Sequence, residues 1–442
     1  MPSSVYRLAG ILVLGAMAPL LDSTIVSLAL HTLGHDLRTS TTSVQWVSTA
    51  YLLALAAVVP VSGWAVERYG ARRVWLGSLS LFLAGSMLCG LAWNIGSLVV
   101  FRIVQGVGGG VLLPVLQTLV MRAAGGRDLG RLMAVITLPA LLGPILGPVL
   151  GGLIVGHLSW RWIFYVNLPL CLLALALAWR GIPKDGPGTA HRLDTTGLLL
   201  LSPGLAALVY GLSQDGTVRA TSIPLGALLV ALFTAHALRS PAPLVDLRLF
   251  RDRAFAVSST LMFLNGLALY GGMFLLPLYY QQVRHEGVMA AGLLLAPQGL
   301  GALLARPTGG LADRFGPRPV VLAGLALTAL GTLPYTTGTH SVPWLGAALV
   351  VRGFGMSAAN LVLMVGAYRD LAPADVPHAG STVRALQQLG GSFGTAVLGV
   401  LVRSGTGTAY AHAFGWTTLL ALLAAGAALA LPAQVAAAQT PS

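Results

Sequence analysis

The stretch that decides the fold is GWAVERYGARR at residues 63–73, because residues 309–319 repeat it as GGLADRFGPRP. About forty residues after the start of each copy, a lone arginine, Arg102 or Arg352, precedes a glycine-rich run. The same order of features in both places indicates two halves of the chain that repeat in parallel. The aligned positions are Gly63 with Gly309, Glu67 with Asp313, Arg68 with Arg314, Gly70 with Gly316 and Arg72 with Arg318.

Each copy combines a glycine, an acid and basic residues. Gly70 and Gly316 permit a tight turn. The acid and the arginines can form ion pairs that hold neighbouring helices together in one state and release them in another. We therefore predict two gating loops at the cytoplasmic edge. Ordinary loop charge is the alternative, and the recurrence of the spacing favours gating.

The composition is that of a membrane protein. Of 442 residues, 56% are hydrophobic and 9% are charged, with a mean hydropathy of +0.80, whereas soluble proteins are about one quarter charged. Apolar stretches of about 20 residues, enough to cross the bilayer as helices, recur throughout. We predict an all-α polytopic membrane protein with 14 transmembrane helices. The predicted spans are residues 8–30, 44–66, 74–93, 97–120, 132–156, 161–180, 195–213, 222–238, 254–280, 288–309, 319–336, 343–366, 379–402 and 413–432.

The repeat divides these spans into six, two and six. We predict an N-terminal six-helix bundle over residues 1–180, two inserted helices with cytoplasmic linkers over residues 181–253, and a C-terminal six-helix bundle over residues 254–442. Parallel repeats about an axis normal to the membrane are typical of transporters whose binding site lies at the bilayer midplane between the halves.

The basic residues orient the spans. Nineteen of the 26 Lys and Arg residues fall in connections on the side that holds both termini, and five fall on the opposite side. Basic loops stay in the cytoplasm, so both termini are predicted to be cytoplasmic. This distribution over short loops also accounts for the net charge of +13 without a nucleic-acid partner.

Several motifs resemble the major facilitator superfamily and, within it, the fourteen-helix drug:proton antiporter branch. The resemblance covers nearly the whole chain. The two loops match the family pattern G-x-L-A-D-R-x-G-R-R, although the first copy has Val66, Glu67 and Ala71 in place of Ala, Asp and Arg. The stretch that begins at Leu21 resembles the first-helix signature of this branch, L-D-x-T-I-V-N-x-A-L-P, except that Ser27 replaces Asn and His31 replaces Pro. The other matching stretches are LDSTIVSLAL (21–30), VQWVSTAYLL (44–53), FRIVQGVGGG (101–110), GPILGPVLGG (143–152), SWRWIFYVNLP (159–169) and RALQQLGGSFGTA (384–396).

One acid differs in position from the other twelve. Asp22 lies well inside the first span, whereas the others fall in loops or at span ends. At about 1.5 Å per residue it lies about 21 Å from the cytoplasmic end. A charged acid is costly there, and burial favours its protonated form. We predict that Asp22 couples transport to protons. The alternative is an acid that only pairs with an arginine or caps backbone groups.

Arg102 is predicted to share the proton-coupling site with Asp22. It lies at a similar depth, and the family fold brings the first and fourth helices together. An interaction with Asp22, direct or through Gln105 or water, would let Arg102 alter the proton affinity of the acid. A snorkelling arginine is the alternative. Arg352 holds the equivalent place in the second half with no intramembrane acid beside it, so its predicted role is structural.

The fifth span carries small residues at a spacing that allows close helix packing. The resemblance implies that this antiporter helix helps to seal or shape the cavity, and Pro148 is expected to kink it. The residues of this motif are Gly143, Gly147, Pro148, Gly151 and Gly152.

Polar and aromatic residues within the spans are candidates to line a substrate cavity, although such residues also join helices to one another. The candidates are Gln45, Trp46, Tyr51, Gln105, Gln117, Asn265, Tyr270, Phe274, Gln298, Asn360, Gln387 and Gln388. Because Asp22 is the single intramembrane acid, neutral, zwitterionic or monocationic amphiphiles are favoured over dications. Competition of proton and substrate at or near Asp22 is the simplest coupling scheme.

The function predicted from these features is that of a proton-coupled secondary active exporter of drug-like or antibiotic molecules, working by alternating access and not an enzyme. The proton gradient drives it, so no cofactor and no metal are expected. Its partners are a small amphiphilic substrate, protons and membrane lipid, and it is expected to act as a monomer in the bacterial cell membrane. The alternative is a secondary transporter of a lipid, sugar or metabolite, working by symport. A non-transporting sensor is a third class, but the longest cytoplasmic loop, residues 181–194, is too short for an interaction domain.

Overall fold

The computed structural model describes residues 3–124, 143, 146–183, 193–338, 341–367 and 376–431. Among the helices of these residues, 11 are long and apolar enough to cross a membrane. Two shorter apolar helices, Leu146–His157 and Val288–Leu304, lie within further predicted spans. The chain is therefore an all-helical, multi-pass membrane protein.

The described helices fall into two halves and an insert. The first half comprises α1 (Ser3–Asp36), α2 (Thr41–Val58), α3 (Val61–Tyr69), α4 (Ala71–Gly90), α5 (Ile95–Ala124), α7 (Trp162–Tyr165) and α8 (Asn167–Gly181). The insert comprises α9 (Thr195–Ser213) and α10 (Gly216–Arg239). The second half comprises η1 (Leu247–Arg251), α11 (Arg253–Leu278), η2 (Tyr279–Val283), α12 (Val288–Leu304), α13 (Thr308–Phe315), α14 (Pro317–Thr332), η3 (Leu333–Tyr335), α15 (Val342–Gly366), α16 (Val376–Leu401) and α17 (Gly407–Ala428).

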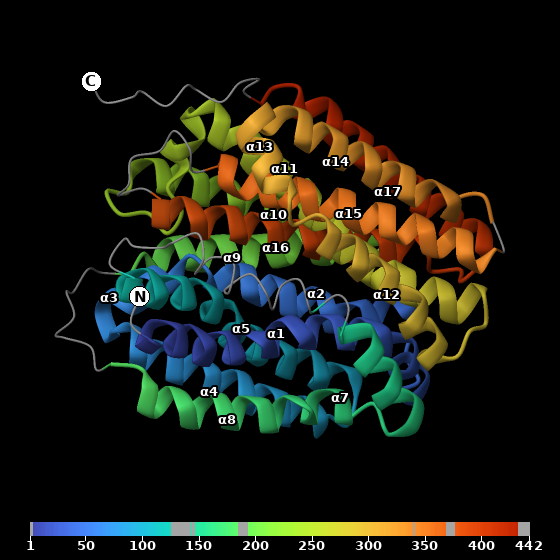
Figure 1. Cartoon of the computed structure of the whole chain (residues 1–442), viewed down its shortest axis with the longest axis horizontal. Helices are drawn as coiled ribbons and strands as arrows, with labels where there is room; N and C mark the ends of the chain where they lie inside the picture. Colours follow the sequence, from blue (N-terminus) through green and yellow to red (C-terminus); the bar gives the residue numbers. More distant parts are fainter. Residues whose placement is uncertain are drawn as a thin grey trace.

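The two halves lie side by side with their long helices roughly parallel (Figure 1). The start of the chain and α3 lie at one end of these helices, and α7 lies at the other (Figure 1). Contacts between the halves run from α2 to α16 and from α1 to α11. In the insert, α9 packs on α10 and touches α16 and α2, whereas α10 otherwise meets only η1 among the larger contacts of the described elements.

The repeat seen in the sequence is also a repeat of backbone geometry. Short helices α3 and α13 each follow a proline, Pro60 or Pro307, and each ends at a glycine with φ of 87°, Gly70 or Gly316. A φ in this left-handed region favours glycine. Near the start of each short helix, a hydroxyl donates 2.6 Å hydrogen bonds to the carbonyl three residues earlier, from Ser62 to Val59 and from Thr308 to Ala305.

These short helices correct two predicted spans. The spans at 44–66 and 288–309 were each expected to be continuous, but α2 ends at Val58 and α12 ends at Leu304. Proline starts a helix well and continues one poorly, so Pro60 and Pro307 begin new short helices. A third difference lies in the insert, where α10 starts at Gly216 rather than near residue 222.

Among the described residues, one buried apolar cluster is shared by the two halves, and it lies at one end of the helices. One buried cluster combines residues of both halves, including Val26 and Leu33 of α1, Leu275 of α11, Leu398 of α16 and Val402. These residues lie toward the end of the helices that is predicted to face outward. The buried members of the other two clusters belong to one half each. We call the shared cluster the common core.

Candidate functional site

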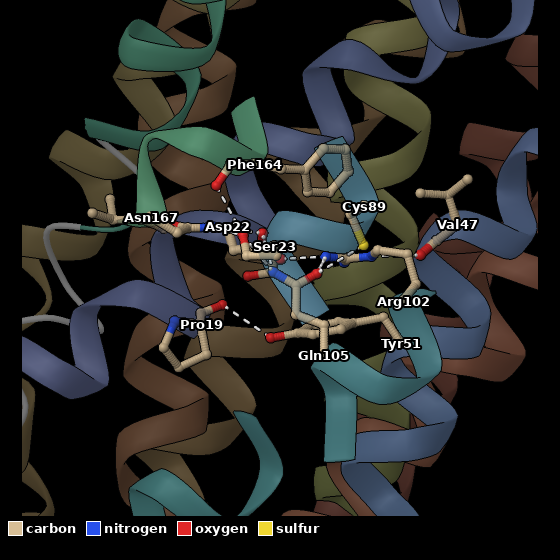
Figure 2. A network of polar contacts seen from close by, with 12 residues as sticks. Pro19, Asp22, Ser23, Val47, Tyr51, Cys89, Arg102, Gln105, Phe164 and Asn167 are labelled. Atoms are coloured by element: carbon tan, nitrogen blue, oxygen red, sulfur yellow. Dashed lines mark hydrogen bonds and ion pairs between the residues drawn. The ribbon is translucent and has the colours of Figure 1, made fainter. Parts of the chain in front are cut away.

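A fully buried ion pair lies at the middle of the first half. Asp22 of α1 is 0% exposed and Arg102 of α5 is 1% exposed. Arg102 Nη1 donates a hydrogen bond to Asp22 Oδ2, as Figure 2 shows. Removing two charges from water costs a large amount of free energy. A buried ion pair therefore persists only where further hydrogen bonds satisfy its remaining donors and acceptors.

The second carboxylate oxygen, Asp22 Oδ1, accepts two hydrogen bonds from amides. Gln105 Nε2 donates over 2.9 Å and Asn167 Nδ2 donates over 3.0 Å. Both amides also donate to Ser86 Oγ, over 3.2 and 3.0 Å, and Ser86 Oγ donates to the Phe164 carbonyl over 2.9 Å. Donors to both oxygens favour the ionised form of a carboxylic acid, so this geometry fits a deprotonated Asp22.

Arg102 has partners other than Asp22. Its Nε donates to the Val47 carbonyl over 3.0 Å, and its Nη1 also donates to Gln105 Oε1 over 2.7 Å. The guanidinium lies 3.9 Å from the ring centroid of Tyr51, close enough for a cation–π interaction. The arginine would therefore keep favourable contacts if Asp22 became neutral.

Local chemistry fixes the turn of α1 that carries Asp22. Pro19 lacks the N–H that would continue the helix ladder, and its own carbonyl accepts from Tyr51 over 3.4 Å. Ser23 Oγ donates to the Leu20 carbonyl over 2.9 Å, and Thr24 Oγ1 donates to the Leu21 carbonyl over 2.8 Å. The carboxylate thus projects from a helix turn held on both sides.

The glycine-rich antiporter motif packs on this same turn. A side chain at Gly147 would overlap Thr24, and one at Gly151 would lie 3.3 Å from Ile25 Cα. Gly143 lies farther up, over Leu20. On its other side, the helix Leu146–His157 approaches α12, where Gly152 faces Met289 and Pro148 faces Gly292. This helix therefore lies between α1 and the second half.

The predicted gating loops have the expected glycine turns, and their charge relay stays a prediction. Glu67 and Arg68 are exposed, and Glu67 forms no ion pair within the described part of the chain. Arg72 Nη2 donates to the Trp179 carbonyl. Arg314 lies 5.1 Å from the ring centroid of Phe315. The side chain of Asp313 lies outside the described residues, and Arg318 is half-buried. Gly63 has open space around it, whereas a side chain at Gly309 would meet Leu361.

The predicted substrate-lining residues divide by their surroundings. Gln45, Tyr51, Gln105 and Phe274 are buried within the protein in this conformation. Trp46 faces Tyr210 of α9, with ring centroids 5.6 Å apart. Gln298 accepts a hydrogen bond from Arg352 Nη1 over 2.8 Å.

The remaining candidates lie mainly in the second half. Asn360 Oδ1 accepts from Asn265 Nδ2 over 3.0 Å and from Gln387 Nε2 over 2.7 Å. Tyr270, Gln388 and Gln117 are half-buried.

One face of α16 is turned toward the first half. Thr395 Oγ1 lies 2.8 Å from Thr49 Oγ1 of α2, across the boundary between the halves. Residues three to four positions apart share a helix face, so Gly391, Gln388 and Arg384 continue this face of α16 from Thr395, and Tyr270 of α11 packs against it at Gly391. This face of α16, which we call the α16 wall, contacts the first half through Thr395.

Sequence reasoning missed three members of the Asp22 site. Asn167 lies in the quoted stretch SWRWIFYVNLP but received no role. It is an amide in an apolar segment, which is a usable signal. Ser86 is a common small residue, and nothing in the sequence indicated a role for it. Cys89 also received no role, and its Sγ lies 3.6 Å from Gln105 Oε1.

Repeated helical halves with a buried ion pair at mid-helix define a multi-pass membrane transporter. The chain belongs to the Major Facilitator Superfamily, whose family model matches residues 12–395 and 298–441. It is thus a transporter and not an enzyme.

Similar proteins agree with this assignment. The chain is 44% identical over 409 residues to "Multidrug resistance protein B homolog" of Mycobacterium tuberculosis, covering 90% of this chain and 76% of the relative. It is 30% identical over 422 residues to "Lincomycin resistance protein LmrB" of Listeria innocua, covering 92% and 89%. The crystal structure of a D-xylose-proton symporter matches with a TM-score of 0.70 at 16% identity, covering 98% and 99% of the chains. This last likeness shows the fold alone.

Proposed function

We propose that the protein is a proton-coupled antiporter that exports drug-like or antibiotic molecules by alternating access between its two halves. The observation that carries the proposal is the buried Asp22, whose carboxylate is held by Arg102, Gln105 and Asn167. The names of the relatives support drug export. We further propose a 6+2+6 arrangement of fourteen helices in the bacterial cell membrane, with cytoplasmic termini and a functional monomer.

The coupling we propose acts at a distance. Both oxygens of Asp22 are occupied and the residue is 0% exposed, so a substrate has no access to it in this conformation. The sequence favoured competition of proton and substrate at or near Asp22, and in this state such competition would have to occur near the carboxylate rather than at it. Protonation would instead act through the helices that meet at Asp22, which include α1, α5 and α8. The proton gradient supplies the driving force.

The proposed substrates are neutral, zwitterionic or monocationic amphiphiles. The α16 wall presents amides and Arg384, and Asn265 and Asn360 lie behind it. Amides both donate and accept hydrogen bonds. A wall of this kind suits polar uncharged groups better than the two positive charges of a dication.

The test is a susceptibility panel in a host that lacks its own pumps. We expect the wild-type protein to raise resistance to at least one compound and Asp22→Asn to abolish that resistance, because Asn cannot bind and release a proton. Asp215→Asn is the matched control, since this exposed acid pairs with Arg403 away from the site. Full resistance in Asp22→Asn would refute the coupling role.

Inverted membrane vesicles separate export from symport. Acidifying the vesicle interior should drive uptake of the exported compound by wild type and by Asp215→Asn, but not by Asp22→Asn. Uptake driven instead by an acidic exterior would refute antiport in favour of symport.

A further inference from the structure

Asn167 links the buried acid to a different part of the first half. It is the first residue of α8 and is 1% exposed. Its Nδ2 donates to Asp22 Oδ1 over 3.0 Å and to Ser86 Oγ of α4 over 3.0 Å. Ser86 in turn donates to the Phe164 carbonyl of α7. Within the described part of the chain, no hydrogen bond involves Asn167 Oδ1.

In the part of the chain that the structure describes, four charged or titratable groups interact with Asp22. Those that interact with it electrostatically are Arg102 of α5, Tyr51 of α2, Cys89 of α4 and Cys171 of α8. Asp22 is the one carboxyl among them. A proton that arrives at this cluster from an acidic exterior therefore binds Asp22.

A protonated Asp22 does not fit the present arrangement. Among the described residues, the groups that hydrogen-bond to its oxygens are all N–H donors, whereas the O–H of a carboxylic acid needs an acceptor. Arg102 has no acceptor atom. The acceptor of Gln105, Oε1, already takes hydrogen bonds from Arg102 Nη1 and Cys89 Sγ. Asn167 is the remaining acceptor. If its side-chain amide rotates by half a turn, Oδ1 takes the place of Nδ2 next to the Asp22 carboxyl group.

We propose that Asn167 is the positioning residue that reports the protonation state of Asp22 to α7 and α8. This inference rests on the proposed function, in which Asp22 is the coupling acid. With Asp22 ionised, Asn167 donates to Oδ1. When a proton from outside forms the O–H bond at Asp22, the Asn167 amide turns and accepts from it. The same proton leaves Asp22 toward the cytoplasm later in the cycle.

The turn of Asn167 has a consequence for Ser86. In the ionised state Ser86 Oγ accepts from both amides and donates to Phe164. After the turn, Asn167 Oδ1 faces Ser86, and the hydroxyl rotates to donate to it. The Phe164 carbonyl then loses the hydrogen bond that Ser86 donates to it. Protonation thereby weakens the contact of α4 with α7, which adjoins the common core through Ile163 and Phe164.

The test is an infrared titration of the purified full-length protein. The carbonyl stretch of a protonated carboxylic acid is followed against pH, and its loss in Asp22→Asn assigns the band. Asn167→Leu keeps the branched shape of Asn, although its methyl groups are larger, and removes both donor and acceptor. A hydrogen bond to a charged group is worth more than one to a neutral group. We therefore expect the midpoint in Asn167→Leu to rise by about one pH unit.

The controls separate this effect from a general disturbance. Thr328→Val removes a buried hydroxyl that bonds only within α14, and its midpoint should equal that of wild type. Ser86→Ala removes the anchor of Asn167 and should shift the midpoint in the same direction by less. If Asn167→Leu does not fold, Ser86→Ala carries the test. An unmoved midpoint in the folded variant overturns the inference.

The titration needs no transported compound, so it separates the two proposals. If the band shifts as expected while wild type exports no compound, the proposed function fails and the link between Asn167 and Asp22 stands. If export requires Asp22 but the titration midpoint of Asp22 is the same in Asn167→Leu as in wild type, the proposed function stands and this inference fails.

Discussion

Asp22 and Arg102 depend on one another for their charges. Neither has access to water, and each keeps its charge because the other neutralises it and neighbouring polar groups fill the remaining hydrogen-bonding positions. The exposed pair of Asp215 and Arg403 offers a contrast, since solvent screens it on both sides. The two pairs should therefore respond very differently to the loss of one partner.

Removal of Arg102 tests this dependence. Arg102→Leu leaves a buried acid without its counter-charge, and we expect a loss of about 3–5 kcal/mol in stability. The double variant Asp22→Asn, Arg102→Leu should be more stable than Arg102→Leu alone, because no unpaired charge remains. Thermal unfolding in detergent, followed by tryptophan fluorescence, measures both.

Arg403→Leu is the control for the loss of an arginine from an ion pair. It should cost less than about 1 kcal/mol, as surface pairs do. If Arg102→Leu were as mild as Arg403→Leu, or if the double variant were the least stable of all, the pair would not have the dependence described here.

At the residue scale, the sequence identified the pair and Gln105 beside it, but not Asn167 or Ser86. Asp22 and Arg102 were predictable because each is a lone charge at a similar depth in an apolar segment. Asn167 and Ser86 come from α8 and α4, and only the packing of these helices brings them to the carboxylate. The depth of a neutral polar residue in an apolar segment does not show which groups it contacts. For the same reason, the sequence could not show that most substrate-lining candidates are buried or hydrogen-bonded to other side chains.

At the scale of elements, turn chemistry was more predictable than helix continuity. The glycines at Gly70 and Gly316 fixed the repeated turns, and both have the same positive φ. The breaks before Pro60 and Pro307 were overlooked because the apolar pattern runs through them. Hydropathy indicates which segments lie in the membrane, but it does not indicate where one helix ends and the next begins.

The insert offers a pH-dependent prediction at this scale. Asp194 precedes α9 and accepts from the backbone N–H groups of Gly197 and Leu244 over 2.8 and 2.9 Å. Its Oδ1 also lies 2.7 Å from His236 Nε2 of α10. Burial raises the pKa of Asp194, but these hydrogen bonds together lower that pKa below its usual value.

The sign of the effect follows from this lowered pKa. The ionised Asp194 stabilises the folded insert above the pKa of the unfolded chain, and this contribution disappears as the pH falls through the folded pKa. Asp194→Asn should therefore speed amide hydrogen exchange at the start of α9 at neutral pH, with a smaller difference from wild type in acid. Asp252→Asn, which alters the cap of α11, should leave α9 unchanged. A difference that grows in acid would contradict the assignment.

At the scale of the whole molecule, the structure has its two halves joined at the end predicted to face outward. The common core combines both halves there, and Thr49 meets Thr395 across the boundary. Gln281 Nε2 of η2 also donates to the Leu28 carbonyl of α1 over 3.0 Å. The parallel repeat predicted two halves, but which end is closed depends on side-chain contacts between helices distant in sequence.

The closest of these contacts predicts a way to hold that end open. Gly399 of α16 lies against the Gln45 side chain of α2, so that even a single added carbon would overlap it. Gly399→Val should prevent closure and lower export, whereas Gly415→Val, with open space around it, should do neither. A cysteine placed at Val402, which is buried in the common core, reports closure in a background without Cys89 and Cys171. Its labelling by an impermeant thiol reagent from outside should rise several-fold with Gly399→Val. Equal labelling in the two glycine variants would show that contact between Gly399 and Gln45 does not govern closure, because a protein that tolerates the larger side chain must bring its halves together elsewhere.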